Sequence, residues 1–435
     1  MGHQSGLGRF LKKAYGIMFY VLLMDRLDTV PAGLFSALRR LKYVYLVLLL
    51  LFFLSAVFKS GFKKREGIAV CVVLILLLHT LLWGRIFVNY KLVTDTRIHL
   101  RELLLLLLFI SGTAFLYSRE GSVDEFAKHS YFAYFLSLLW AGLTHITHFV
   151  NPVKFVYVLG GAHSFRVDFG MGHANYVGSI CCCALICSIF LFEKIRNHGS
   201  LKKALRNRKI KRLIISDIYI GEMLFSTASR TAILAFASAV IIYILICADE
   251  LFPSNGMGSA RLIIIILGTI VVLYLLVEGF FNELLSESHR DSLLSTNYDI
   301  MINNFSLWTG MGYINYSGFA FGIWAYGFET ANADSYYAYI FFATGVLGAS
   351  IIGLGLVITT ITVIIRSYFQ KNICGVMTVV SFLFIGAAQA SILSYDHLIS
   401  YTYWIILLLV MSNSVGLQIQ KTNVNGLYEG QYLYR

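Results

Sequence analysis

The chain has 435 residues, of which 58% are hydrophobic and 13% are charged, and its mean hydropathy is +0.72. A soluble protein of this length could not bury so much apolar surface, so the composition excludes a soluble globular fold. The formal net charge is +12, but the basic residues cluster between apolar runs and do not indicate nucleic-acid binding.

The apolar runs are too long for the strands of a barrel and therefore predict membrane-spanning helices. A weaker run over about 14–35 contains Asp25, Arg26 and Asp28, and we expect it either to span the bilayer or to lie at its interface. Basic residues precede this run and no small-residue cleavage site follows it, so an uncleaved anchor is expected. The strong runs cover 42–58, 67–83, 102–118, 130–149, 176–192, 213–228, 231–248, 261–278, 344–365, 374–393 and 398–412.

The predicted fold is therefore an all-α polytopic membrane protein of about 11–12 transmembrane helices, forming a single integral membrane domain over 1–435. Lys and Arg concentrate in 193–212, which predicts a basic cytoplasmic loop that contacts anionic lipid. By alternation, 150–175 and the long loop of about 279–343 are extracytoplasmic, and 413–435 is a cytoplasmic tail. Between Leu262 and Ile365 the single basic residue is Arg290, which suggests one cation kept for an anionic ligand.

The seven cysteines indicate neither disulfides nor a metal site. All of them lie within expected spans or at the edge of one, and the group Cys181–Cys183 with Cys187 has an apolar setting without His, Asp or Glu. The chain also lacks a Walker motif and a dinucleotide-binding fingerprint. No cofactor and no metal are predicted.

The first polar group, over 166–178, precedes the expected span 176–192 and reads RVDFGMGHANYVG. Its glycines permit tight backbone turns, and Arg166 offers a planar fork to a phosphate. His173 and Asn175 are candidates for shaping the same site. An ordinary loop turn in which Asn175 caps the following helix explains the pattern equally well.

The second group is Ser229-Arg230-Thr231, between two closely spaced spans. The short connection places Arg230 at the outer interface, where it could bind an anion. The alternative is an arginine that extends toward lipid head groups.

The third group lies in the loop 279–343 and contains His289-Arg290-Asp291, Trp308, Trp324 and many tyrosines. Aromatic faces with nearby polar groups suit sugar rings. An aromatic belt at the membrane interface explains the aromatic residues but not the single cation.

The loop ends at Asp334, which is followed by a run containing Gly345 and Gly348. An acid on the outer face, close to several arginines, could act as a general base. Equally, Asp334 could cap the helix that follows it.

In this order, the segments resemble the bacterial O-antigen polymerase and O-antigen ligase superfamily over about 165–350. Arg166 to Gly178 is similar to the polymerase pattern, with Ala174 in place of the usual proline. Ser229-Arg230-Thr231 matches the family's Ser-Arg-Thr, and Arg290 followed by a Gly-x-Gly turn resembles its loop motif. Asp334 stands where the ligase pattern has His.

The resemblance implies a metal-independent, inverting glycosyltransferase of the plasma membrane with its active site facing outside. The enzyme would polymerise polysaccharide repeat units by moving a glycan from undecaprenyl diphosphate onto a lipid-linked repeat unit. Arg166, Arg230 and Arg290 would bind diphosphate, and Asp334 is the first choice of base. His289 and Asp291 are the other candidate bases; the residues expected to shape the substrate site are His173, Asn175, Ser229, Trp308 and Trp324.

Two other functions fit the same sequence. A ligase would move finished glycan from the same carrier onto another acceptor, and its loss would leave long chains on the carrier, whereas loss of a polymerase leaves single units. A flippase or transporter of lipid-linked oligosaccharide should place charged, broken helices near the bilayer midplane. A chain-length regulator and a flippase are candidate partners of a polymerase, together with membrane lipid.

Overall fold

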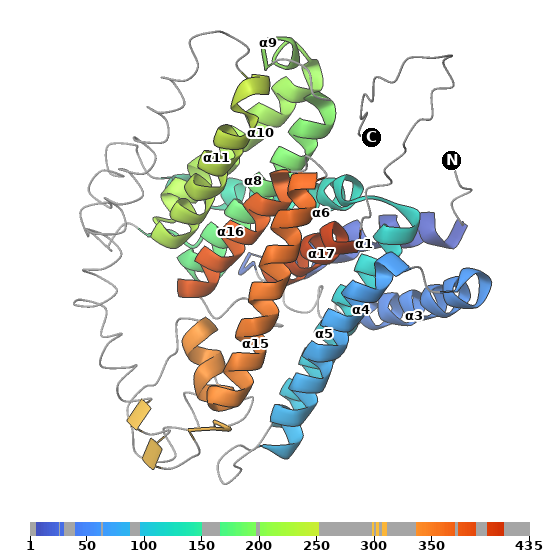
Figure 1. The fold of residues 1–435 in the computed structure, drawn as a ribbon. Coiled ribbons are helices and arrows are strands. Elements are labelled where there is room, and N and C mark those ends of the chain that lie inside the picture. The colour runs from blue at the N-terminus through green and yellow to red at the C-terminus, as the bar shows by residue number, and fades with distance from the viewer. Residues whose placement is uncertain are drawn as a thin grey trace.

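A computed structural model gives the fold (Figure 1), and its described secondary structure consists of helices apart from a single bridge residue, Gly310. The predicted all-α class is therefore confirmed for the described part of the chain. The structure describes residues 6–25, 27–29, 40–61, 64–87, 96–149, 166–196, 201–251, 298–299, 302–303, 307–310, 336–369, 373–388 and 398–412.

The described helices follow the expected apolar runs closely. In chain order they are α1 (Gly6–Met24), α3 (Leu41–Ser60), α4 (Lys64–Leu81), the π-helical turn η1 (Leu82–Ile86), α5 (Thr96–Glu120), α6 (Val123–Thr144), the 3₁₀ turn η2 (Ile146–His148), α8 (Ala174–Arg196), α9 (Leu201–Ala204), α10 (Arg208–Ser226), α11 (Arg230–Leu251), α15 (Tyr336–Phe369), α16 (Ile373–Ala388) and α17 (Leu398–Ser412).

Three helical segments in the described ranges are long and apolar enough to cross a bilayer: Leu41–Lys59, Ala174–Arg196 and Tyr337–Ser367. Shorter apolar helices accompany them in α4, α11, α16 and α17. These helices support a membrane protein, while the number of spans and the orientation of the chain stay predictions.

Several boundaries differ from the expected ones. The weak run 14–35 corresponds to α1, which begins earlier and ends at Met24. The expected span 130–149 ends as an α-helix at Thr144 and continues as the turn η2. The basic segment 193–212 contains the end of α8, the short α9 and the start of α10 in place of a simple loop. The expected span 261–278 and the tail 413–435 lie outside the described residues.

α8 lies at the centre of the bundle, where α6, α10, α11, α16 and α17 all pack against it (Figure 1). In the apolar 18-residue window of α8, 83% of the residues are buried inside the protein, compared with 17% in the corresponding window of α3. Small side chains such as Ala184 and the buried, free Cys181, Cys182 and Cys183 allow neighbouring helices to approach closely. The cysteine run is therefore explained by packing.

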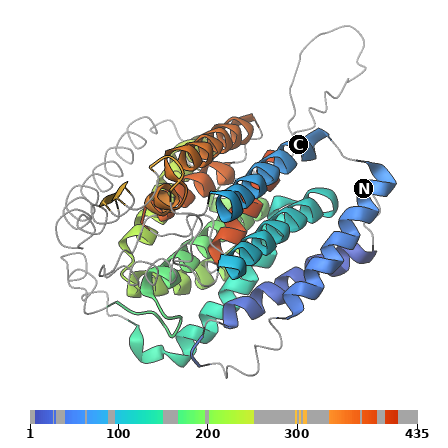
Figure 2. The same cartoon turned by 90° about the horizontal axis from the view of Figure 1, so that it is seen from below.

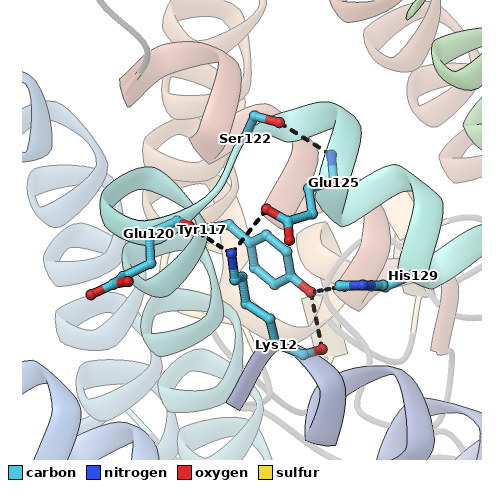
Figure 3. Close-up of polar contacts among 6 residues, drawn as sticks. All are labelled: Lys12, Tyr117, Glu120, Ser122, Glu125 and His129. Atoms are coloured by element: carbon cyan, nitrogen blue, oxygen red, sulfur yellow. Dashed lines mark hydrogen bonds and ion pairs between the residues drawn. The ribbon is translucent and has the colours of Figure 1, made fainter. Parts of the chain in front are cut away.

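α1 lies along α6 at the edge of the bundle away from α15 (Figure 2). One end of this contact is the Lys12 cluster, which comprises Lys12, Tyr117, Glu120, Glu125 and His129 (Figure 3). The buried Lys12 ammonium donates to the Glu120 carbonyl at 2.6 Å and pairs with the Glu125 carboxylate at 3.0 Å. Tyr117 bonds His129 at 2.5 Å through its hydroxyl group. The Lys12 cluster fixes the start of α1, and hence the position of the residues that follow α1.

Candidate functional site

The segment that leads into α8 is a tight turn over 166–173. Phe169, Gly170 and Gly172 have φ values of 47°, 72° and 85°. Glycine adopts this left-handed region freely, whereas a residue such as Phe169 is strained there by about 1–3 kcal/mol. Packing of the Phe169 ring against Phe149, with centroids 5.2 Å apart, offsets this strain. The Gly170 amide also donates to the Asp168 carboxylate at 3.1 Å, which tightens the turn.

Arg166 lies at the start of this turn and is half-buried. Its Nη2 donates to the Asn175 side-chain carbonyl in the first turn of α8. His173 precedes the helix, and its Nδ1 accepts the Asn175 amide at 3.2 Å. The residue that caps α8 is therefore His173, and the expected alternative of an Asn175 cap is wrong. Asn175 instead orients the guanidinium of Arg166.

The second polar segment lies between α10 and α11. Ala228 has φ = 49°, so this turn also carries a strained non-glycine residue. Ser229 begins α11 by accepting the Ile233 amide at 3.0 Å, which places Arg230 at the first position of the helix. The Ser229 hydroxyl is fully buried and has no hydrogen-bond partner among the described residues.

The two segments meet at one end of α8. The Val167 amide donates to the Ser226 carbonyl at 3.3 Å, across a gap of many residues in sequence. Gly178 lies so close to the second turn that an added Cβ would be 2.5 Å from Ser229 Cβ and 3.0 Å from Thr227 Oγ1. The structure thus brings together the two segments that carry five of the predicted site residues: Arg166, His173, Asn175, Ser229 and Arg230.

Arg230 is half-buried and occupies the N-terminal end of a 22-residue helix. The helix dipole disfavours a cation at this end by about 0.3–1 kcal/mol, because the free amides there already form a positive pole. An anion bound at this point would interact favourably with both the amides and the guanidinium. A substrate diphosphate and the phosphate of a lipid head group are both such anions, so the two expected roles of Arg230 stay predictions.

Two residues that the sequence did not single out as site residues contact the same turn. The Asp28 amide donates to the Gly170 carbonyl at 2.9 Å. His145, just beyond α6, has its Nε2 at 3.6 Å from Asp28 Oδ1. In the sequence, Asp28 was a reason to doubt a membrane span, and nothing linked it to His145.

Residues 307–310, which include the first glycine of the Gly-x-Gly turn, pack against the glycine-containing start of α15. α15 is broken at Gly345, where φ is 62°, in contrast to the continuous helix expected over 344–365. The amides of Val346 and Leu347 donate to the carbonyls of Leu307 and Trp308 at 3.0 and 3.1 Å. Gly310 fits against this break, since a Cβ on it would be 2.5 Å from the Gly345 amide nitrogen.

The η1 turn supports this contact from the other side. Trp83 Nε1 donates to the Thr309 carbonyl at 3.1 Å, and the His79 ring stacks on Trp83 with centroids 4.4 Å apart. His79 Nε2 also lies 3.0 Å from the Gly348 carbonyl. Trp308 is 60% exposed, so it lies at the surface of this contact.

Neither family models nor curated proteins match this chain. The relationship to O-antigen polymerases and ligases therefore rests on the motifs alone.

The remaining predicted site residues lie outside the described part of the chain. They are His289, Arg290, Asp291, Trp324 and Asp334, and their expected roles stay predictions. Within the described ranges, no three His, Cys, Asp or Glu side chains are grouped as metal ligands.

Proposed function

We propose that the protein is a polysaccharide repeat-unit polymerase of the plasma membrane. It transfers a growing glycan from undecaprenyl diphosphate to a lipid-linked repeat unit on the outer face, with inversion and without a metal. The observation that supports this proposal most directly is the meeting of the Arg166 segment with the Ser229-Arg230 segment at one end of α8.

The leaving diphosphate gains negative charge as the glycosidic bond breaks. Preorganised donors stabilise such charge by about 3–4 kcal/mol each, or roughly 10²- to 10³-fold in rate. Arg166 is held by Asn175 before any ligand arrives, and Arg230 adds a guanidinium to the positive end of α11. In this proposal Arg290 supplies a third cation and a base takes the proton of the acceptor hydroxyl; Asp334, His289 and Asp291 are the candidate bases that the sequence predicts.

The test uses purified full-length protein with a lipid-linked repeat unit and a chelator. We expect a ladder of products that differ by one repeat unit. Arg166→Ala should slow ladder formation at least 100-fold, whereas Arg208→Ala, which removes an exposed arginine at the start of α10, should leave it unchanged. A wild-type protein that makes no ladder would refute the proposed polymerase.

The same assay separates the two alternatives. A ligase would transfer preassembled glycan to another acceptor without extending it, and a flippase would move the lipid-linked unit across vesicle membranes without forming bonds.

The break in α15 is a feature found in transporters. Here the Val346 and Leu347 amides at the break donate to loop carbonyls, which favours a structural role for the break over ion coordination.

A further inference from the structure

The most informative contact outside the predicted site is the pair formed by Asp28 and His145. We propose that His145 is the general base that deprotonates the acceptor hydroxyl, and that Asp28 is its positioning residue. This inference rests on the proposed function and assigns its proton-transfer step to residues that no sequence motif contains.

The orientation of the His145 ring is set by its other nitrogen. Nδ1 lies 3.0 Å from the Ala141 carbonyl and 3.1 Å from the Thr144 hydroxyl. A carbonyl only accepts hydrogen bonds, so Nδ1 carries the proton in the neutral ring and Nε2 is the basic nitrogen. The Nε2 lone pair thus faces the side on which Asp28 lies.

The distance between the two groups leaves this lone pair available. Nε2 is 3.6 Å from Asp28 Oδ1, which is too long for a hydrogen bond, so the carboxylate does not occupy the lone pair of the neutral ring. Once Nε2 is protonated, the same distance is short enough for attraction between the carboxylate and the imidazolium. The His145 side chain is 14% exposed and the Asp28 side chain 63% exposed. In this proposal the acceptor hydroxyl reaches Nε2 beside the Asp28 carboxylate.

Gly170 connects this pair to the arginine site. A Cβ on Gly170 would overlap Asp28 Oδ1 and lie 2.6 Å from His145 Cε1, so the absence of a side chain makes room for both groups. Arg166 lies four residues earlier in the same turn. The turn thus connects a base on one side to a phosphate-binding guanidinium on the other, as the transfer reaction requires.

The proposed step balances without any further reactant. The acceptor oxygen attacks the anomeric carbon of the donor sugar while its proton passes to His145 Nε2. The bond from that carbon to the diphosphate oxygen breaks, and its electron pair leaves with the diphosphate toward Arg166 and Arg230. The Asp28 carboxylate stabilises the imidazolium that forms, and the proton then returns to solvent.

The first experiment replaces His145 in the ladder assay. We expect His145→Ala to lower kcat about 10²- to 10⁴-fold with little change in the KM for the acceptor, and added imidazole should restore part of the rate. His148→Ala is the matched control, because the His148 ring is exposed and lies 5.3 Å from that of His145; it should stay within about twofold of wild type.

Asp28 and Gly170 give independent tests of positioning. Asp28→Asn should lose most of kcat, and Asp28→Glu should recover part of it, because a carboxylate is again near Nε2. Gly170→Ala should lose more activity than Gly172→Ala. Both glycines have positive φ, so alanine strains the backbone at either position. A Cβ at Gly172 would meet no atom within 4 Å, so any additional loss in Gly170→Ala comes from displacement of Asp28 and His145.

The outcomes separate this inference from the function on which it rests. If wild type forms ladders and a folded His145→Ala protein does so at the same rate, the base assignment is wrong and the polymerase stands. The assignment is also wrong if His145→Ala elutes from size-exclusion chromatography as wild type does but loses rate that added imidazole does not restore. His145 would then have a structural role. If wild type forms no ladder, the polymerase and the base assignment both fall.

Discussion

The contact between Gly310 and the break in α15 allows a prediction of how strongly residues 307–310 are held against α15. With the loop in place, Gly310→Ala would put a side chain at φ = 67°, which costs about 1–2 kcal/mol. It would also force a Cβ to within 2.5 Å of the Gly345 amide nitrogen, which costs about 1–3 kcal/mol. Neither atom can move unless the backbone moves, because the Cβ is fixed to its Cα and the nitrogen belongs to the main chain.

The alternative for the variant is to release residues 307–310 from α15. Release gives up the hydrogen bonds from Val346, Leu347 and Trp83 to the loop carbonyls, at about 0.5–1.5 kcal/mol each. The hydrogen bonds are lost on release in both proteins, whereas the strain is present only in the attached variant, so we expect the variant to favour release by the sum of the two strain costs, about 2–5 kcal/mol relative to wild type. The lower limit of that range corresponds to a roughly 30-fold shift of the equilibrium toward the released state.

Hydrogen exchange measured by mass spectrometry in nanodiscs can detect this change. The amides of Val346 and Leu347 should exchange at least roughly 30-fold faster in Gly310→Ala, because they lose their loop acceptors. Gly353→Ala is the control in the same helix, since its Cβ would meet no atom within 4 Å. Equal exchange at these amides in both variants and wild type would refute the reasoning that Gly310 is required for loop attachment.

Three other substitutions test the site and the scaffold. Arg290→Ala should abolish chain extension while leaving membrane insertion unchanged, and product of normal length would remove Arg290 from the mechanism. Arg230→Lys should lose most of its activity, at least 10-fold in kcat/KM, because an ammonium cannot reproduce a bidentate guanidinium; wild-type turnover would favour a lipid contact. Lys12→Ala should lower the free energy of unfolding by about 1–3 kcal/mol, since it leaves the partly exposed Glu125 without its ion pair. The exposed Lys13 provides the control, and equal melting temperatures for the two alanine variants would contradict a stabilising Lys12 cluster.

Hydropathy predicted the helices well because each apolar run is a local property of the sequence. α3 and α17 follow the expected runs 42–58 and 398–412 almost residue for residue. The break at Gly345 escaped prediction because a glycine in an apolar run leaves the mean hydropathy nearly unchanged. Only the backbone conformation, which depends on contact with a distant loop, distinguishes this glycine from Gly353.

The candidate site could be predicted only in part. Arg166 and Arg230 were identifiable because each belongs to a short motif with polar neighbours, and the structure places their segments in contact. Asp28 and His145 were not identifiable, because their approach depends on α1 lying along α6, and no local pattern encodes that pairing. The available signal was Asp28, an acidic residue in the weak apolar run 14–35. A helix lying at the membrane interface explained its presence more simply.

The attachment of α1 through Lys12 has a consequence for the order in which the protein is assembled. The ammonium of Lys12 reaches a carboxylate 113 residues further along the chain, so during synthesis α1 is made long before its ion-pair partner exists. In that interval the ammonium lacks this carboxylate and must be solvated by water or by phospholipid. α1 can therefore take its final place only after α6 has been made, and the contacts of Asp28 with His145 and Gly170 form later still, when the turn before α8 has been translated.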